Sequence, residues 1–426
     1  MLLKIRFSDT GRCAVASACL GLLFQNSLSA LTLEQALERA EAQSPRLEIL
    51  HERQLAAEAA IGSAGTLPDP KLQLTYFGES VETRTGPQEA IYAFNQTVPW
   101  VPKLRTRKTL ASRHAEAVAY DYAGGHERLL REVTNVYVEL AYLQKAIEST
   151  EANLSLIADT YSIVEEQVKA GASLNSLLRL EVDRERVRDH LELLKQQAIR
   201  QRASLAALLN MEDSELNQSF FFPERAIPAA EHENLQKQLD KTNPDLLALR
   251  QRILGSEEQL QLSRLNRYPD FTFGLTYIQV GNEGMASDAG KDPWALTFAV
   301  NLPIWEGKNR AEIRAASANQ RAVEQLYREQ QLKLKAELTA LLSQVSDSAQ
   351  RSDRYREMLI PLAEQALENS RSAYEGNQIS VLELIDSERA LLELNLTYWR
   401  AVANVLQAEA SINALIGNAY SQKNFQ

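Results

Sequence analysis

An internal duplication constrains the fold of this chain more than any other feature of its sequence. Four short segments recur in the same order, at offsets of 199 to 205 residues. The matched pairs are 45 with 244, 68–69 with 269–270, 94–99 with 298–303, and 170–171 with 375–376. Several matches in one order predict a duplicated unit of about 200 residues, so the fold must be assembled from two similar halves.

A seam of apolar residues recurs at the offset of 205 and carries an arginine in its third position both times. The first copy is Leu177, Leu180, Arg184, Val187, Leu191 and Leu194, and the second is Leu382, Ile385, Arg389, Leu392, Leu396 and Trp399. Steps of three and four residues predict helices that pack lengthwise, as in a coiled coil. We divide the chain after residue 30 into a first repeat at 31–210, a proline-containing junction at 211–230, a second repeat at 231–418 and a C-terminal tail at 419–426.

Residues 1–30 have the layout of a secretory signal peptide. Basic residues precede an apolar run at 13–24, and small residues end at Ala30, where we expect cleavage. The run is too short for a membrane anchor, which needs roughly 20 apolar residues. Cleavage would remove both cysteines, Cys13 and Cys19, and with them any disulfide; lipidation of Cys19 is a second possibility.

Each repeat is predicted to begin with a helix, at 32–66 and 231–267, interrupted near Pro45 and Pro244. Two strands follow, in which large apolar residues alternate with small or polar ones. The strands centre on 72–76, 92–98, 271–277 and 295–302, and polar loops at 78–88 and 281–292 join them in pairs. We expect each strand to have about 9–11 residues, which crosses a bilayer when the strand is tilted.

Three of the four tryptophans lie at the ends of these strands. Outer-membrane barrels carry aromatic girdles at such positions. The expected girdle consists of Trp100, Trp294, Trp305, Tyr76 and Tyr277. A soluble sandwich is the alternative, but two isolated hairpins offer too little sheet to form a core. No apolar stretch after residue 30 has the length of a transmembrane helix, so entry into a membrane would use the strands.

Very long helices are predicted after each hairpin, because 103–169 contains no proline and 307–375 contains only Pro361. Pro361 is expected to bend its helix. Each long helix ends in a turn that leads into a returning helix, and Gly171 and Gly376 suit the left-handed position after a helix end. The two turns form the expected tips: Gly171, Ala172, Ser173, Leu174, Gly376, Asn377, Gln378, Ile379 and Ser380.

The fold class is therefore mainly α with a small β part. Four strands are too few to close a membrane barrel, since known barrels have at least eight, and lipid does not tolerate an open sheet edge. If the strands span a membrane, the chain must oligomerise, and two copies would supply eight strands while three would supply twelve. The second face of the strands carries small or polar residues, which suit an open pore. This favours twelve strands, because twelve enclose a wider pore than eight.

The arrangement resembles the TolC-like outer-membrane efflux family. The resemblance rests on residues 31–40 (LTLEQALERA), both strand hairpins, the FNQTVP and FAVNLP segments, both tips, and residues 381–394 (VLELIDSERALLEL). It implies a homotrimer in the outer membrane of a Gram-negative bacterium, with a twelve-stranded β-barrel and an α-helical barrel that extends through the periplasm. It also implies a passive channel whose tips dock to a periplasmic adaptor (membrane fusion) protein and an inner-membrane pump. Residues 67–72 look somewhat like the heavy-metal-export subgroup.

The resemblance also implies functional residues at the second tip. Family members carry an acidic ring there, and the alignment places Glu383 and Asp386 at its positions; an ordinary solvated helix face is the alternative. Some relatives close the tip with a tyrosine and an arginine. Tyr374 is the nearest tyrosine, but Gln378 occupies the arginine position, so Arg184 and Arg389 are the alternative gate contacts.

The remaining features exclude other classes of protein. A net charge of −10 offers no basic excess for nucleic acid. The five histidines lack metal-ligand spacing, and no cofactor or catalytic motif is present, so we expect neither a cofactor nor enzymatic activity. The sequence thus favours an efflux channel for small toxic compounds or metal ions. The alternatives are the duct of a type I protein secretion system and, from another class, a periplasmic adaptor with a coiled-coil hairpin, or a soluble scaffold. The cargo and the pump are not encoded in any motif.

Overall fold

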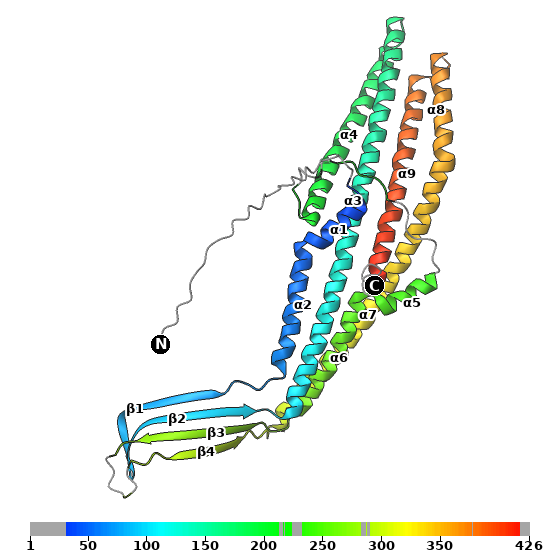
Figure 1. Ribbon diagram of the computed structural model, residues 1–426. Coiled ribbons are helices and arrows are strands. Elements are labelled where there is room, and N and C mark those ends of the chain that lie inside the picture. Colours follow the sequence, from blue (N-terminus) through cyan, green and yellow to red (C-terminus); the bar gives the residue numbers. More distant parts are fainter. Residues whose placement is uncertain are drawn as a thin grey trace, which may run out of the picture.

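The computed structural model describes residues 31–212, 216, 218–223, 232–282, 287, 290–376 and 378–417. The expected signal peptide with Cys19, the expected C-terminal tail and Asn377 lie outside these residues. The molecule is long, with helical tips at one end and a sheet at the other (Figure 1). The tips and the sheet are therefore two separate surfaces joined by helices.

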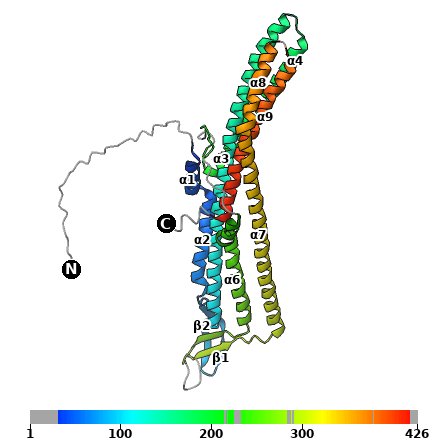
Figure 2. The same ribbon diagram turned by 90° about the vertical axis from the view of Figure 1, so that its right-hand side faces the viewer.

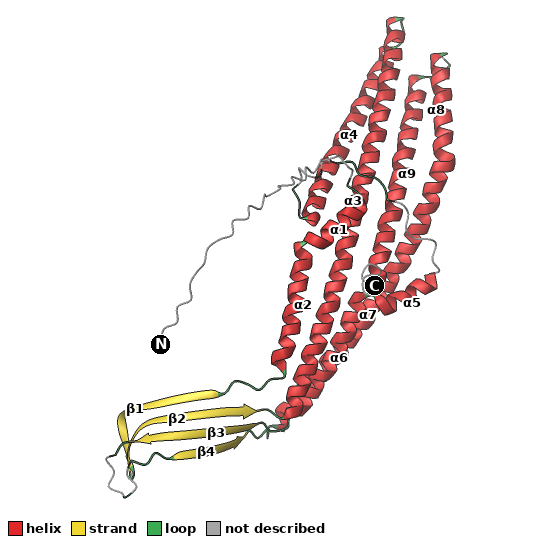
Figure 3. Ribbon diagram, viewed as in Figure 1, coloured by secondary structure: helices red, strands yellow, loops and turns green. Residues whose placement is uncertain are grey.

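Both repeats have the same order of elements, helices, then a strand hairpin, then a long helical hairpin (Figure 3). The first contains α1 (Leu33–Gln43), α2 (Pro45–Ala64), β1 (Lys71–Thr83), β2 (Gly86–Val98), α3 (Val101–Lys169) and α4 (Leu174–Leu209). The second contains α5 (His232–Thr242), α6 (Pro244–Leu265), β3 (Phe271–Val280), β4 (Trp294–Val300), α7 (Glu306–Arg354), a π-helical turn (Tyr355–Leu359), α8 (Ile360–Glu375) and α9 (Val381–Ile416). The 69 residues of α3 correspond to a rod of about 100 Å.

The expected helix interruptions are confirmed, and local chemistry explains them. Thr32 and Gln35 form a capping box at the start of α1. Pro45 opens α2, and Pro244 opens α6 after Asn243, whose side-chain oxygen accepts a hydrogen bond from the Leu246 amide at 2.9 Å. Proline fits the first helical turn because the amide there needs no partner within the helix.

The bend expected at Pro361 coincides with an irregularity in the helix. The π-helical turn ends two residues before Pro361, and it separates α7 from α8. Proline lacks an amide donor, so the hydrogen-bond ladder must shift locally where it enters a long helix. The corresponding helix of the first repeat, α3, has no proline after Pro102 and runs without a break.

The four strands form one antiparallel sheet in the order β1-β2-β3-β4. The prediction of a loop over 78–88 is wrong in extent. β1 runs to Thr83 and β2 begins at Gly86, so most of these polar residues belong to the two paired strands. Gly86 has φ +128°, a conformation that glycine accepts readily and that permits this short turn. The strands have 13, 13, 10 and 7 residues, whereas a similar length of about 9–11 residues was expected for all four.

The tips differ slightly from the expectation. Gly171 has φ +108° and follows the end of α3, as predicted. The prediction for Gly376 is wrong, because α8 extends as far as Glu375, so Gly376 is the cap residue itself and has an ordinary φ of −76°. The next residue, Asn377, lies outside the described part.

The helices that form the two tips lie side by side in the order α4, α3, α9, α8, and both views show the two tips together (Figures 1 and 2). One apolar cluster near the tips draws from both hairpins. Its buried members are Ile157, Val164, Leu180, Tyr374, Val381, Leu384 and Ile385. A second cluster around Tyr137 joins α1, α3 and α4, and Phe220 from the junction enters it. Contacts of α3 with α6 and with α9 pack the two repeats together along their length.

Candidate functional site: the sheet face and the helical tips

One face of the sheet carries large apolar side chains in rows that cross all four strands. One row consists of Leu72, Phe94, Leu275 and Leu296. The neighbouring row consists of Leu74, Tyr92, Tyr277 and Trp294. All eight side chains are exposed. The opposite face carries small or polar residues in matching rows, for example Gln73, Ala93, Thr276 and Ala295. An exposed apolar surface of this extent indicates contact with lipid or another apolar partner.

The expected girdle residues divide between the two ends of the sheet. Trp100 and Trp305 precede α3 and α7, at the junction with the helices. Trp294 begins β4 and pairs with Tyr277, in the part of the sheet furthest from the helices, and Tyr76 lies in the neighbouring row. From Phe271 to Tyr277 the sheet spans about 20 Å at roughly 3.4 Å per residue. The aromatic residues thus flank an apolar band, with Trp100 stacked on Tyr268 at 6.1 Å.

Tyr374 joins the two hairpins at the tip. Its ring is buried, and its hydroxyl donates a hydrogen bond to Gln167 Oε1 at 2.6 Å, from α8 to α3. Burial raises the pKa of Tyr374, so the hydroxyl keeps its proton at neutral pH. The tyrosine that sequence reasoning selected therefore contacts the opposite hairpin of its own chain.

The two acidic candidates lie on the surface of the first turns of α9. Glu383 and Asp386 are both exposed. The Glu383 amide bonds to the cap residue Ser380, and Asp386 lies 3.6 Å from Arg389. Their carboxylates share one helix face, as the spacing of three predicts.

The tip residues form two turns that are open to solvent. Gly171, Ala172, Ser173 and Leu174 are all exposed, and in the second turn Gly376, Gln378 and Ser380 are exposed while Ile379 is half-buried. Ser173 and Ser380 cap α4 and α9 through their hydroxyl groups. Each tip thus presents a short polar loop whose neighbouring helix begins with a stable cap.

The two arginine candidates behave differently. Arg389 crosses from α9 to α4, where its Nη2 lies 2.5 Å from Asp183 Oδ1. Arg184 stays on its own helix, where it pairs with Glu181, and its guanidinium lies 5.0 Å from the Tyr161 ring centroid. Of these two arginines, Arg389 forms an ion pair with the other hairpin, and Arg184 pairs within its own helix.

Glu388 is a buried carboxylate that sequence reasoning missed. Its side chain is 1% exposed, and Thr160 Oγ1 donates to its Oε1 at 2.8 Å. Burial raises the pKa of Glu388; the Thr160 hydrogen bond and the Arg371 charge act in the opposite direction, while Asp183 and Asp159 add to the increase. The signal in the sequence was its position directly before Arg389, which belongs to the apolar seam.

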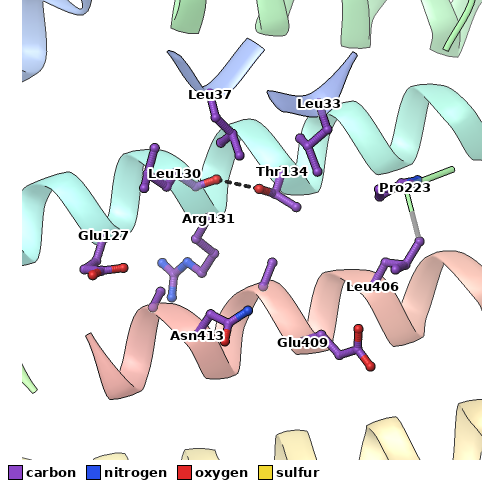
Figure 4. Close-up of a pocket in the computed structure, with 12 residues that line it drawn as sticks. Leu33, Leu37, Glu127, Leu130, Arg131, Thr134, Pro223, Leu406, Glu409 and Asn413 are labelled. Carbon is purple, nitrogen blue, oxygen red and sulfur yellow. Dashed lines mark hydrogen bonds between the residues drawn. The ribbon is translucent and has the colours of Figure 1, made fainter. Parts of the chain in front are cut away.

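A cavity of about 230 Å³ lies further from the tips, between α1, α3 and α9 (Figure 4). Leu33 and Leu37 of α1 form one wall, and Leu406 of α9 faces them. Its polar neighbours Glu127 and Glu409 already have partners of their own. In the described part of the chain no group of three histidine, cysteine, aspartate or glutamate residues is arranged to hold a metal ion.

No described helix is both long enough and apolar enough to cross a membrane.

The sequence profile described as "Outer membrane efflux protein" matches residues 235–418, which include α6, β3, β4 and the second helical hairpin. The chain therefore resembles this family over its second repeat. It is also similar to the cobalt-zinc-cadmium resistance protein CzcC of Cupriavidus metallidurans, with 22% identity over 416 residues that cover 96% of this chain and 94% of the relative.

Solved structures confirm the fold. The outer membrane protein VceC of Vibrio cholerae matches with a TM-score of 0.76 at 19% identity, over 90% of this chain and 96% of that one. CusC matches with a TM-score of 0.78 at 15% identity, over 93% and 95%. The expected resemblance and fold class are therefore confirmed, and the chain shares the fold of these outer-membrane proteins. Members of this family are channels and not enzymes.

Proposed function

We propose that three copies of this chain form the passive outer-membrane channel of a tripartite efflux system. The twelve strands of the trimer close one β-barrel, and the helices continue it as a barrel through the periplasm. A periplasmic adaptor protein docks at the helical tips, and an inner-membrane pump supplies the energy. The cargo is a small toxic compound or a metal ion.

One observation carries the proposal: the sheet has an exposed apolar face and two unpaired outer strands. Leu72, Tyr76, Leu296 and Trp294 are among its most exposed large side chains, and a soluble monomer rarely exposes so large a contiguous apolar patch. Lipid would cover this face, and neighbouring copies would pair with β1 and β4. Both requirements are satisfied together only when the strands of several copies close into a ring.

The relatives favour metal ions as cargo. CzcC is named for resistance to cobalt, zinc and cadmium, and another relative is the cation efflux system protein CusC. Glu383 and Asp386 are exposed on one face of α9, and three copies would place six carboxylates around the tip. A ring of carboxylates attracts cations and repels anions.

The tip turns are the proposed docking surface for the adaptor. Charged substitutions at Ala172 and Gln378 should abolish export and leave the oligomer intact, because both residues are exposed and contribute to no core cluster. Normal export by such variants would place docking elsewhere on the chain.

The direct test is the mass of the detergent-extracted protein from purified outer membranes, combined with metal tolerance of a strain that lacks it. We expect a complex of three chains, and loss of tolerance to zinc or cobalt that the intact gene restores. A monomer in the periplasmic fraction would refute the channel. A trimer whose loss stops secretion of a protein, with unchanged metal tolerance, would instead support the secretion duct.

A further inference from the structure

An ion pair joins the two repeats where the sheet meets the helices. The side chain of Lys103, in the first turn of α3, is 4% exposed, and its Nζ lies 2.8 Å from Asp270 Oδ1, just before β3. The same carboxylate oxygen accepts a hydrogen bond from the Trp100 amide at 2.9 Å, and Lys103 Nζ also donates to the Tyr268 carbonyl oxygen at 2.8 Å. The segment after β2 is therefore held to the segment before β3, its neighbouring strand.

The duplication provides an equivalent for both partners of this pair. A lysine stands three residues after the tryptophan that follows each hairpin, as Lys103 in the sequence WVPK and as Lys308 in WEGK. An aspartate follows a proline just before the first strand of each repeat, as Asp69 and as Asp270. The counterpart of the observed ion pair is therefore Lys308 with Asp69.

The two counterpart residues lie apart within one chain. β1 and β4 are the opposite edges of the sheet (Figure 1), and Asp69 precedes β1 while Lys308 follows β4. Asp69 is exposed, and the side chain of Lys308 is 71% exposed, with Glu312 of its own helix 3.8 Å away. The contrast with the 4% exposure of Lys103 indicates that Lys308 lacks the neighbour that the other repeat provides for Lys103.

The two tryptophans show the same contrast. Trp100 stacks on Tyr268, with ring centroids 6.1 Å apart, and is 38% exposed. Its repeat equivalent, Trp305, is 72% exposed, and Leu67, which corresponds to Tyr268, is also exposed. One edge of the sheet thus ends beside an exposed cation and an aromatic ring, and the other begins beside an exposed carboxylate and an apolar side chain. These two edges are complementary in charge and in polarity.

The ladder between β2 and β3 predicts how β4 of one copy would pair with β1 of another. Phe94 pairs with Leu275 in that ladder. Their repeat equivalents are Phe298 and Leu74. Both belong to the apolar face, so this register keeps the large apolar side chains on one side, whereas a shift by one residue would mix the two faces. The same register brings the segment after β4 beside the segment before β1.

We propose that Lys308 forms an ion pair with Asp69 of a second copy, where the sheet meets the helices, and that Trp305 packs on Leu67 of that copy. Pairs within a chain then alternate with pairs between chains around the ring, because the second strand of each repeat meets the first strand of the next. The inference rests on the proposed homotrimer and identifies the residues that join its subunits at the rim of the barrel nearest the helices.

The location of the pair is tested by cross-linking two differently tagged chains in one cell. One chain carries Asp69→Cys and the other Lys308→Cys, and outer membranes are treated with a short bifunctional methanethiosulfonate reagent. We expect a dimer that contains both tags and that a reducing agent separates. The matched control replaces Lys308→Cys by Arg310→Cys. The side chain of Arg310 is 74% exposed and lies two residues further along α7, about 200° around the helix, so it should give little of this product.

Charge reversal tests whether the contact is an ion pair. Asp69→Lys or Lys308→Asp alone places like charges together, and the trimer should dissociate about tenfold faster in detergent at a fixed temperature, because three partly exposed pairs are lost. The double reversal should restore the native rate, which a role of either residue within its own chain would not predict. An intact trimer that gives no mixed cross-link, or whose double reversal is no better than the single ones, would overturn the pair. The absence of any trimer would refute the proposed channel and the pair with it.

Discussion

The hydrogen bond between Tyr374 and Gln167 provides a quantitative test of the proposed gate at the tip. Replacing Tyr374 with phenylalanine removes one hydroxyl and keeps the ring, so the apolar cluster around it is preserved. The substitution leaves Gln167 Oε1 without its donor, which at present lies 2.6 Å away. Only the link between α3 and α8 is lost.

The expected effect follows from the partly buried position of this bond. A hydrogen bond of this kind contributes about 1 kcal/mol, since water partly replaces it once it is broken. Three copies that open together would lose about 3 kcal/mol of closed-state stability. This corresponds to an increase of about 100-fold in the ratio of open to closed channels.

Single-channel recordings of the purified protein in planar bilayers measure this ratio directly. Tyr161→Phe is the matched control, because Tyr161 is half-buried on α3 near the same tip and its described contacts involve the ring, which lies 5.0 Å from the Arg184 guanidinium. Both variants should retain the oligomer and the conductance of the open state. An open probability for Tyr374→Phe equal to that of the control would show that this bond does not oppose opening.

Three further predictions concern selectivity, stability and pH. Replacing Glu383 and Asp386 with alanine should weaken cation selectivity, so that the reversal potential across a salt gradient moves toward zero; an unchanged potential would remove both from the conduction path. Phe220→Ala should cost about 3–5 kcal/mol, because a fully buried ring leaves a cavity, and urea denaturation should show a lower midpoint. The pKa of Asp240 lies below its ordinary value. Burial alone would raise this pKa, but the hydrogen bonds from Lys335 and Gln331 together lower it by more than burial raises it. The contact between α5 and α7 is therefore stabilising at neutral pH and lost as pH falls through the lowered pKa; Asp240→Asn should remove this acid sensitivity, as measured by proteolysis of α5.

The local elements could be predicted because their causes are local. Pro45 and Pro244 end one helix and start the next through the geometry of their own rings. The alternation along β3 and β4 determines which face is apolar whatever the partner strand is. The error at 78–88 shows the limit of this reasoning, since polar residues there remain in the ladder through pairing such as Val81 with Gln88.

The buried charges could not be predicted, because distant helices bury them. Glu388 stands in a charged stretch and would be exposed on an isolated helix; Thr160, 228 positions away, covers it. Asp183 is likewise buried and receives Arg389 from 206 positions away. Periodicity identified the seam but could not distinguish the arginine that crosses to the other hairpin from the one that does not.

The sequence by itself determined the duplication, the type and order of the elements, the apolar face of the strands and the resemblance to the efflux family. These features depend on residue spacing and backbone preferences that act within a few residues or repeat at a fixed offset. Only the tertiary structure decided which hairpin contacts which, that Tyr374 bonds to Gln167, and that Glu388 retains an unsatisfied oxygen. The reason is that burial and pairing arise between segments some 200 residues apart, and the strength of a charge or hydrogen bond depends on that environment.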